Sequence, residues 1–597
     1  MPDLHSVARR LARGRGLKVA AAATALAAAA VLAAIMAFAG RGFDLTDEAY
    51  YVLSMQEPAA YRMTSTLFGY ALRPVYLLLG GSIFGLRVFG VLALAALGAA
   101  AMALVLASRR QPGTSSPARR ERGTMQSMVE GARPAEGVAA ALVAGAVLPA
   151  MYDGFWLPTP SYNWLVLAAA LLLLPAILLL ADRDRGPALP AALAALAGLI
   201  AALAKPPTAA AYAVLFLAAA ILLLREPRRI AAVLALAFAF TAAGLAVLAA
   251  LLPLETVWAQ TKGYMQMHGA APPAGSGVIH DLLAFLVRPR GWPVVAAAVA
   301  AGLAARRDPA MRTRRIAAAL ATAAIAVAAV RILLFRPYPN LGPGMAAVAY
   351  GAIALALIGG ADRRLCLALA LSALLPLGAA VGTTNDTPSQ TSLHAGLFGL
   401  VALIAAASVR RTEVTTFAAL ALVLLTGAAV WKGLARPYRL AAPLWRQTET
   451  VEIGRHGTLK LDPRTAAFIR ALREGAVQRG FCAGDPVVDL TGELPGVAVA
   501  LGGKTPGLPW LFGGYPFSET LAAWALAGVD APTLGRAWLV VGENRTAFPG
   551  SFVRALGFPF PDAYDPTFEG AHPLHGTPVR LYRPRAAAGA SCPGPGR

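Results

Sequence analysis

Residues 162–181 read YNWLVLAAALLLLPAILLLA, and they are followed by DRDRG at 182–186 and by PALPAALAALAGLIAALA at 187–204. Two uncharged apolar runs thus lie on either side of one short charged loop. An apolar helix of about 20 residues matches the hydrocarbon thickness of a bilayer. The stretch therefore predicts two membrane-spanning helices joined by a hairpin loop.

The same pattern extends in both directions. Of the whole chain, 57% of the residues are hydrophobic and 14% are charged, whereas an ordinary soluble domain carries about 25% charged residues. We expect a polytopic α-helical membrane protein with about thirteen spans. The expected spans are a first run ending near residue 40 and runs at 86–107, 137–151, 162–181, 187–204, 207–224, 230–252, 291–305, 316–334, 344–360, 364–381, 394–409 and 414–432.

The first apolar run follows a basic N-terminus, which is also how a secretory signal peptide begins. Its apolar stretch of about 22 residues is longer than the usual signal core of 7–15 residues. We therefore interpret it as an uncleaved first span. Under either interpretation, the segment that follows residue 40 lies outside the cytoplasm.

Arginine-rich loops alternate with loops that are poor in basic residues. The positive-inside rule assigns arginine-rich loops to the cytoplasm. We therefore predict a bacterial plasma (inner) membrane protein with a cytoplasmic N-terminus and an extracytoplasmic C-terminal part. The loops assigned to the cytoplasm are 108–136, 182–186, 225–229, 306–315, 363–364 and 410–411.

The composition changes after residue 433, where Pro, Gly and charged residues become more frequent. We predict a transmembrane domain over residues 1–433 and a soluble α/β domain over 434–597. Strands are expected at Pro486–Leu490, Ala537–Val541 and Pro578–Tyr582, and helices near 465–479 and 518–528. Cys482 and Cys592 both lie in this part, where an oxidising compartment permits a disulfide.

The net charge of +22 is not interpreted as a sign of nucleic-acid binding. The basic residues lie in short loops between apolar runs, and they are not interleaved with aromatic residues as a strand-binding groove requires. We expect membrane lipids, and no nucleic acid, as partners of this charge.

Residues 67–84 read LFGYALRPVYLLLGGSIF and contain Arg73 and Pro74 near the middle. A full span here would turn the arginine-rich loop 108–136 outward. We therefore predict a helix that lies along or dips into the outer interface, where an arginine can reach the headgroups. This helix would belong to a first outer segment over residues 41–85.

Three carboxylates open this first outer segment: Asp44, Asp47 and Glu48 in GFDLTDEAYY at 42–51. One interpretation is an acidic helix start, with Thr46 or Asp47 as the cap and Glu48 in the first turn. The other is a functional acid site at the membrane surface. The sequence that follows favours the second, because Arg73-Pro74 and then Gly85-Leu86-Arg87 come after the acids in that order.

In these motifs the chain resembles the polytopic glycosyltransferases of the C-type fold (GT-C), specifically the aminoarabinose transferase and protein O-mannosyltransferase branch. Members have an Asp-Glu pair in the first outer loop, a basic residue before a proline in the next interfacial helix, and a similar Gly-to-Arg turn into the second span. The resemblance covers about residues 17–210 by motif and the whole chain by topology.

The resemblance implies an inverting transfer of a sugar from a polyprenyl phosphate to a lipid, glycan or protein acceptor. Asp47 would be the general base that deprotonates the acceptor hydroxyl, with Glu48 supporting it. Asp44 and Tyr51 are weaker candidates for substrate contact. Arg73 would stabilise the leaving phosphate, and headgroup contact is the alternative for it.

Two further outer regions enter through the resemblance. Lys205 stands before Pro206-Pro207, and a family lysine in a similar place contacts the lipid phosphate. In the loop 152–163 some members carry a second essential aspartate, but Thr159 holds the matching position here. Asp153 could substitute for it, and Asn163 is a further candidate for substrate binding. This departure argues against the specific aminoarabinose activity.

Neither a cofactor nor a metal is predicted, because residues such as His268 and His280 lack the spacing of a metal site. A transporter or flippase of lipid-linked glycans is the main alternative function, and a non-catalytic envelope assembly protein is another. A transporter should carry charges near the middle of its spans. The predicted spans are nearly free of charge, which favours the transferase.

Overall fold

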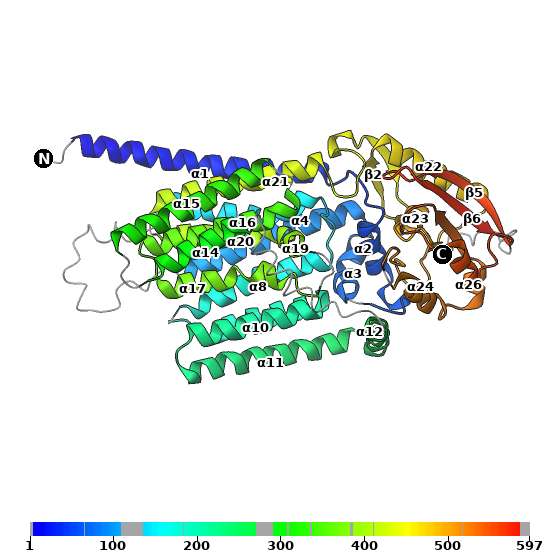
Figure 1. The fold of residues 1–597 in the computed structure, drawn as a ribbon, viewed down its shortest axis with the longest axis horizontal. Coiled ribbons are helices and arrows are strands. Elements are labelled where there is room, and N and C mark those ends of the chain that lie inside the picture. The colour runs from blue at the N-terminus through cyan, green and yellow to red at the C-terminus, as the bar shows by residue number, and fades with distance from the viewer. Residues whose placement is uncertain are drawn as a thin grey trace.

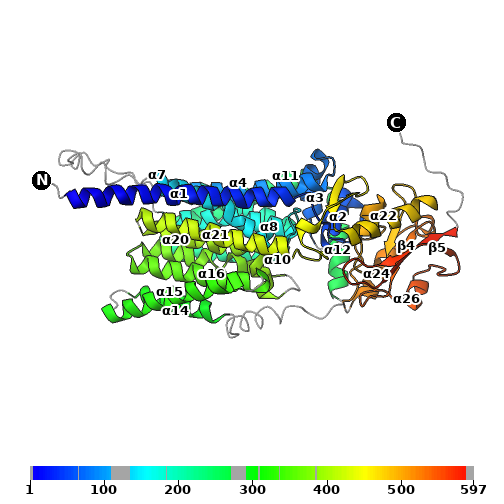
Figure 2. The same ribbon diagram turned by 90° about the horizontal axis from the view of Figure 1, so that it is seen from above.

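The computed structural model describes residues 4–64, 66–108, 135–182, 184–269, 291–306, 310–334, 337–382, 386–409, 411–515 and 517–585. Long helices run roughly side by side through one end of the molecule, and a smaller domain of helices and strands occupies the other end (Figure 1, Figure 2). The short helices α2 (Asp47–Gln56) and α3 (Phe68–Leu78) lie where the two parts meet.

Within the described ranges, nine helices are long and apolar enough to cross a membrane, or ten when one bent pair counts as a span. The nine are the apolar part of α1 (Leu4–Phe38), α4 (Ile83–Ser108), α7 (Ala135–Val147) continued by η2 (Leu148–Phe155), α8 (Tyr162–Leu180), α10 (Pro206–Leu223), α11 (Pro227–Leu251), α15 (Met311–Leu334), α16 (Pro337–Ile358) and α21 (Thr412–Ala435). The bent pair is α19 (Thr387–Leu393) and α20 (Ala395–Ser408), which meet at 64°.

The remaining predicted spans are also helices, but shorter ones. They are α9 (Ala188–Ala204, 17 residues), α14 (Trp292–Ala304, 13 residues) and α17 (Arg363–Ser372, 10 residues), the last continued by α18 (Leu375–Gly378). All thirteen predicted runs are therefore helical, and the polytopic helical membrane fold is confirmed. Fewer than thirteen are full spans, because helices of 10 to 17 residues rise only about 15–26 Å and the hydrocarbon core is about 30 Å thick.

The exposed side chains of helix α11 indicate what kind of solvent surrounds the bundle. Val233 is its only buried residue, while Phe238 is 77% exposed and Leu251 75% exposed. A helix this apolar would not stay exposed in water, but it suits a hydrocarbon environment. Inside the bundle small residues allow close contact: a Cβ on Gly98 of α4 would lie 2.3 Å from the carbonyl oxygen of Gly145 in α7.

Residues 67–84 were predicted not to form one spanning helix, and in the structure they do not. Helix α3 has 11 residues with Pro74 inside it, and a turn with Gly80 and Gly81 at positive φ separates it from the start of α4 at Ile83. Because glycine adopts positive φ without steric penalty, these two residues allow the sharp change of direction.

Beyond α21 the chain forms two small sheets. Strands β1 (Glu449–Glu452) and β2 (Thr458–Leu461) make an antiparallel pair. Strands β3 (Val487–Asp489), β4 (Trp538–Gly542), β6 (Pro578–Pro584) and β5 (Tyr564–Ala571) follow one another in a four-stranded sheet, in which only β3 and β4 are parallel. The helices are α22 (Pro463–Gln478), α23 (Gly496–Leu501), α24 (Ser518–Leu526), α25 (Ala531–Gly535) and α26 (Gly550–Ala555).

The three predicted strands coincide with β3, β4 and β6, and the two predicted helices coincide with α22 and α24. Cys482 is disulfide-bonded. Cys592, the partner that the sequence suggests, lies outside the described residues, and the remaining cysteine, Cys366, is a buried thiol.

The first outer segment is joined to this C-terminal part by backbone hydrogen bonds. The N–H of Lys460 donates to the carbonyl of Gly40, and the N–H of Gly42 donates to the carbonyl of Lys460, both at 2.8 Å. Further along, the N–H of Gly496 donates to the carbonyl of Leu45 at 2.8 Å. The three acids of the segment are thus held between the bundle and the C-terminal part.

Candidate functional site

Asp44, the first of the three acids, caps helix α2. Its Oδ1 accepts the N–H of Thr46 at 2.8 Å and its Oδ2 accepts the N–H of Asp47 at 3.2 Å. A carboxylate in this place satisfies N–H groups that the first helical turn leaves without partners. Thr46, one of the two caps that the sequence suggested, occupies the N-cap position, but its side chain makes no capping hydrogen bond, and Asp44 supplies the acceptor oxygens instead.

Glu48 is held by Arg87 of α4. Nε of Arg87 donates to Oε1 at 2.8 Å and Nη2 donates to Oε2 at 2.6 Å, and the hydroxyl of Thr159 donates to Oε1 as well. The other N–H groups of Arg87 reach the carbonyls of Ala39, Arg41 and Gly42, so all five donors are used. Glu48 is 3% exposed, which leaves its carboxylate no open side for a substrate.

Asp47 points the other way, toward Arg439 just beyond α21. Nη1 of Arg439 lies 3.1 Å from Oδ2 of Asp47, and the two side chains are 33% and 20% exposed. Arg439 has φ of 54°, a left-handed conformation that is uncommon for a residue with a side chain and costs about 1–3 kcal/mol. The neighbouring N–H of Tyr438 donates to the carbonyl of Phe155 at 3.0 Å, which fixes this turn against η2.

Arg439 was not among the predicted site residues, although a signal for it exists. Lys432 ends the last apolar run, and Arg436 and Arg439 follow it in close succession. On the predicted outer side, where the other loops are poor in basic residues, such a cluster departs from the positive-inside pattern. A cation that departs from this pattern is a candidate partner for an outer acid.

Burial raises the pKa of Asp44 and of Asp47, the two acids that Arg87 does not bind. It raises the pKa of Asp44 to about 8, and the nearby Asp47 adds to the rise while Arg439 opposes it. Burial also raises the pKa of Asp47, and the Arg439 guanidinium and a hydrogen bond from Tyr438 limit that rise. The two acids form a coupled pair in which Asp47 is the member closer to the cation. A raised pKa makes the carboxylate of Asp47 a stronger base, which suits a general base.

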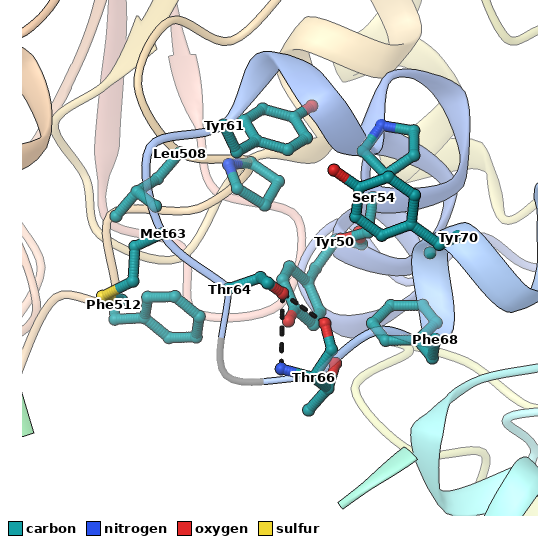
Figure 3. Close-up of a pocket in the computed structure, with 13 residues that line it drawn as sticks. Tyr50, Ser54, Tyr61, Met63, Thr64, Thr66, Phe68, Tyr70, Leu508 and Phe512 are labelled. Carbon is teal, nitrogen blue, oxygen red and sulfur yellow. Dashed lines mark hydrogen bonds between the residues drawn. The ribbon is translucent and has the colours of Figure 1, made fainter. Parts of the chain in front are cut away.

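A pocket of about 250 Å³ adjoins this acid–arginine group. Asp44, Thr46 and Arg439 contribute one wall, and Glu493, His572 and His575 of the C-terminal part contribute another. A second, smaller pocket lies along α2, and five of its thirteen lining residues are aromatic (Figure 3). There Tyr50 lies 5.8 Å from Phe68 and 5.7 Å from Phe512, measured between ring centroids.

Tyr51, a predicted substrate contact, is 3% exposed. Its ring packs edge-on against Phe68 at 5.8 Å and against Tyr162 at 6.0 Å. The Tyr162 ring also lies 5.8 Å from Nζ of Lys205. One aromatic ring therefore stands between helix α2 and Lys205.

Lys205 and Asn163 meet, as two of the predicted site residues. Nζ of Lys205 donates to the carbonyl of Ala379 at 2.9 Å and to Oδ1 of Asn163 at 3.4 Å, and Lys205 is 4% exposed. The N–H of Leu67 donates to the carbonyl of Leu203 at 2.7 Å, so α3 begins beside the same end of α9. Asp153 is 2% exposed, and its Oδ2 has no hydrogen-bond partner among the described residues.

Arg73 lies at the opposite end of α2 from Asp47. Its Nη1 donates to the carbonyls of Met55 and Gln56, the last residues of the helix. A helix rises 1.5 Å per residue, so the nine steps from Asp47 to Gln56 span about 14 Å. The structure therefore does not bring Arg73 to Asp47, and Arg439 is the cation beside that acid.

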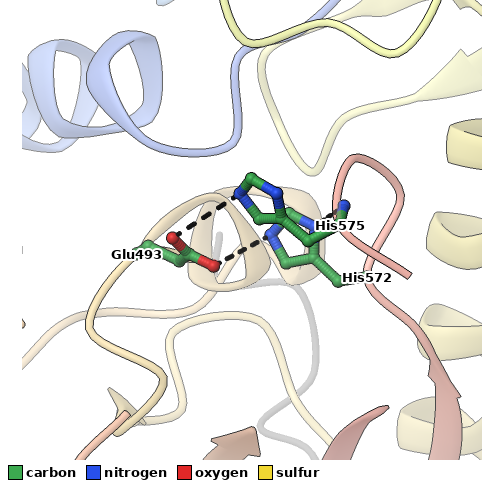
Figure 4. A group of neighbouring side chains, drawn as sticks. All are labelled: Glu493, His572 and His575. Carbon is green, nitrogen blue, oxygen red and sulfur yellow. Dashed lines mark hydrogen bonds and ion pairs between the residues drawn. The ribbon is translucent and has the colours of Figure 1, made fainter. Parts of the chain in front are cut away.

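One group in the described ranges has the residue types and spacing of a metal site: Glu493, His572 and His575, whose candidate ligand atoms lie within 4.8 Å of one another (Figure 4). Burial, together with the nearby His575 and Arg464, lowers the pKa of His572 to about 4, so its imidazole is neutral at pH 7. The sequence predicted no metal, because histidines such as His268 and His280 lack the spacing of a metal site, and Glu493 joins His572 and His575 only through the fold.

No protein-family model and no curated protein matches the sequence. One solved structure, of the arabinofuranosyltransferase AftD from Mycobacteria, aligns with 97% of this chain and 40% of that chain, at 17% identity and a TM-score of 0.39. The chain thus spans less than half the length of that protein. The function proposed below rests on the geometry around Asp47 and not on this likeness.

Proposed function

We propose that the chain is a membrane glycosyltransferase that moves a sugar from a polyprenyl-phosphate donor to a lipid, glycan or protein acceptor of the cell envelope. The bacterial inner membrane would hold it, with the first outer segment and the C-terminal part on the outer face. The observation that supports this proposal is that the adjacent acids Asp47 and Glu48 differ in burial and in pairing. Glu48 is fully paired and buried, whereas Asp47 is partly exposed beside a cation.

In the proposed reaction Asp47 accepts the proton of an acceptor hydroxyl as its oxygen attacks the anomeric carbon. The bond from that carbon to the phosphate oxygen breaks, and the phosphate leaves with the electron pair, so configuration inverts. Arg439 keeps Asp47 ionised and oriented. Asp44 holds the start of α2, and Glu48 acts through Arg87 as a positioning residue and does not touch the substrate.

The leaving phosphate needs a cation at the outer end of the bundle. Lys205 is the candidate that the contacts support, because it lies one ring away from α2 and beside the start of α3. Asn163 would orient the lysine from α8. Arg73 would serve a more distant part of the donor, since it lies about 14 Å along α2 from the proposed base.

The test is transfer by purified, reconstituted protein from labelled polyprenyl-phosphate pentoses and hexoses to an envelope extract. We expect Asp47→Asn to lower the rate by about 10²–10⁴-fold, the usual contribution of a general base. Asp565→Asn is the matched control, because it removes a carboxylate that is 46% exposed and paired with Arg585. Equal transfer by wild type and Asp47→Asn would show that Asp47 is not the base.

The same vesicles separate the transferase from a flippase. A flippase would move the intact labelled lipid across the bilayer without forming a glycosidic bond, and Asp47→Asn would not stop it. Wild-type movement of the donor with no transfer product would overturn the proposal in favour of that alternative.

A further inference from the structure

The group of Glu493, His572 and His575 is separate from the proposed base. Nε2 of His572 lies 3.5 Å from Oε1 of Glu493, and Nε2 of His575 lies 3.9 Å from Oε2 (Figure 4). Two imidazole nitrogens thus face the two oxygens of one carboxylate. Their side chains are 7%, 49% and 18% exposed for His572, His575 and Glu493, so the group is reachable from the pocket.

These distances are close to what a tetrahedral ion requires. Zinc binds imidazole nitrogen at about 2.0–2.1 Å and carboxylate oxygen at about 2.0–2.2 Å, which places tetrahedral ligand atoms about 3.3–3.5 Å apart. The contacts of 3.5 and 3.9 Å need to close by at most about half an ångström, and the widest separation, which is within 4.8 Å, by up to about 1.4 Å, a movement that a side-chain rotation of the half-exposed His575 supplies. From the pairing of two histidines with one carboxylate, we propose that Glu493, His572 and His575 bind one zinc ion.

Polar groups around the ligands orient them, as outer contacts do in zinc sites. Asn544 donates from Nδ2 to Oε1 of Glu493 at 2.7 Å, which fixes the carboxylate. Nη2 of Arg464 donates to the carbonyl of His572 at 3.3 Å, which holds the histidine turn to α22. Three protein ligands leave the fourth position for water or substrate on the pocket side.

Zinc binding at this site costs free energy because His572 must change its tautomer. Its Nδ1 accepts the N–H groups of Leu574 and His575 at 3.1 and 3.2 Å. The neutral ring therefore carries its proton on Nε2 when no ion is bound. For Nε2 to bind zinc, that proton must move to Nδ1 and the two backbone N–H groups must bond water instead. The turn is at the surface, which makes this exchange accessible.

A zinc ion bound here would stabilise the position of the loop that leads into α2. The carbonyl of Glu493 accepts the hydroxyl of Thr46 at 2.7 Å. Zinc would therefore tie the histidine turn to the same loop that holds the start of α2. This role does not rest on the proposed transferase activity, because it concerns only how two loops are joined.

The test uses full-length protein with any affinity tag removed, stripped with a chelator and dialysed against zinc sulfate. We expect about one zinc per chain, and at least tenfold weaker binding in Glu493→Gln and in His575→Ala. Glu569→Gln and His268→Ala are the matched controls, since each removes the same kind of group elsewhere in the chain. Unchanged zinc content in both site variants, or no saturable zinc in wild type, would overturn the proposal.

A second measurement does not depend on the variants folding. The X-ray absorption spectrum of zinc-loaded wild type should show nitrogen and oxygen ligands at about 2.0–2.2 Å, and no sulfur at about 2.3 Å. A spectrum with only water oxygens, or with sulfur, would rule out these three ligands. Zinc should also raise the melting temperature of wild type and not that of His575→Ala.

Discussion

Arg87 of α4 donates two parallel hydrogen bonds to Glu48 of α2, from Nε to Oε1 at 2.8 Å and from Nη2 to Oε2 at 2.6 Å. Both side chains are almost completely buried, at 1% and 3% exposure. The forked guanidinium fixes the rotation of α2 as well as its position. Because Asp47 precedes Glu48, this pair also determines that Asp47 faces Arg439.

We expect Arg87→Ala and Glu48→Gln each to destabilise the fold, by about 3–5 kcal/mol where a buried charge is left unpaired. Arg87→Ala should have the larger effect, because Arg87 also bonds three carbonyls. Thermal unfolding in detergent measures the loss. In the double variant the effects should fall short of additive, and additive losses would show that the two residues act independently.

Arg439→Gln should move the acidic limb of the pH–rate profile to higher pH. Arg439 lowers the pKa of Asp47 against the rise that burial causes, so removing the cation lets that pKa rise further. The limb of kcat/KM reports the free enzyme, and it belongs to the coupled pair of acids. Arg585→Gln is the control, as its guanidinium is 60% exposed in another ion pair. An unshifted limb in Arg439→Gln would contradict the assigned base.

Asp44→Asn should change how stability depends on pH. Burial raises the pKa of Asp44 from 3.8 to about 8, so between these values the folded state binds more protons than the unfolded state. Stability from this group is then complete below pH 4 and is lost as pH rises toward 8. Asparagine is a good capping residue and keeps one of the two acceptor oxygens, so the variant should fold, with some loss of stability at every pH, and should lose this slope. Melting temperatures from pH 4 to pH 8 test it, and equal slopes would argue against a buried, protonated Asp44.

Arg73→Ala separates two roles of that residue. If Arg73 binds the donor, the variant should raise KM for the polyprenyl-phosphate sugar several-fold with little change in kcat. If Arg73 only bonds the carbonyls at the end of α2, the melting temperature should fall and both constants should stay as in wild type. We expect the first result, and measurement of both constants beside the melting curve distinguishes them.

The membrane fold could be predicted because apolar runs report directly on the bilayer. The runs at 162–181 and 187–204 are helices α8 and α9 within a few residues. Composition alone overestimates full spans, since it cannot tell where a helix such as α17 ends after 10 residues. The short strands β3, β4 and β6 were also found, because β-branched runs lie between turn residues there.

The candidate site was predicted only in part, for a physical reason. The acids are adjacent in the sequence, so their clustering is visible, whereas the partner of each depends on tertiary packing. The residues next to Asp47 and Glu48 in the sequence do not show how the two acids will differ. In the fold Glu48 is buried against Arg87, whereas Asp47 is partly exposed beside Arg439. The sequence also did not show that Arg73 would contact Met55 and Gln56 at the far end of α2, because sequence order does not reveal which end of one helix the next helix reaches.

The pairing of Asp47 with Arg439 has a consequence for biosynthesis. The two residues are 392 positions apart (439 − 47), and ribosomes add about 5–20 residues per second. The acid therefore emerges about 20 to 80 s before its guanidinium. During that interval the two aspartates have no guanidinium beside them, so they can be buried at low cost only after residue 439 has been added and until then are best left hydrated.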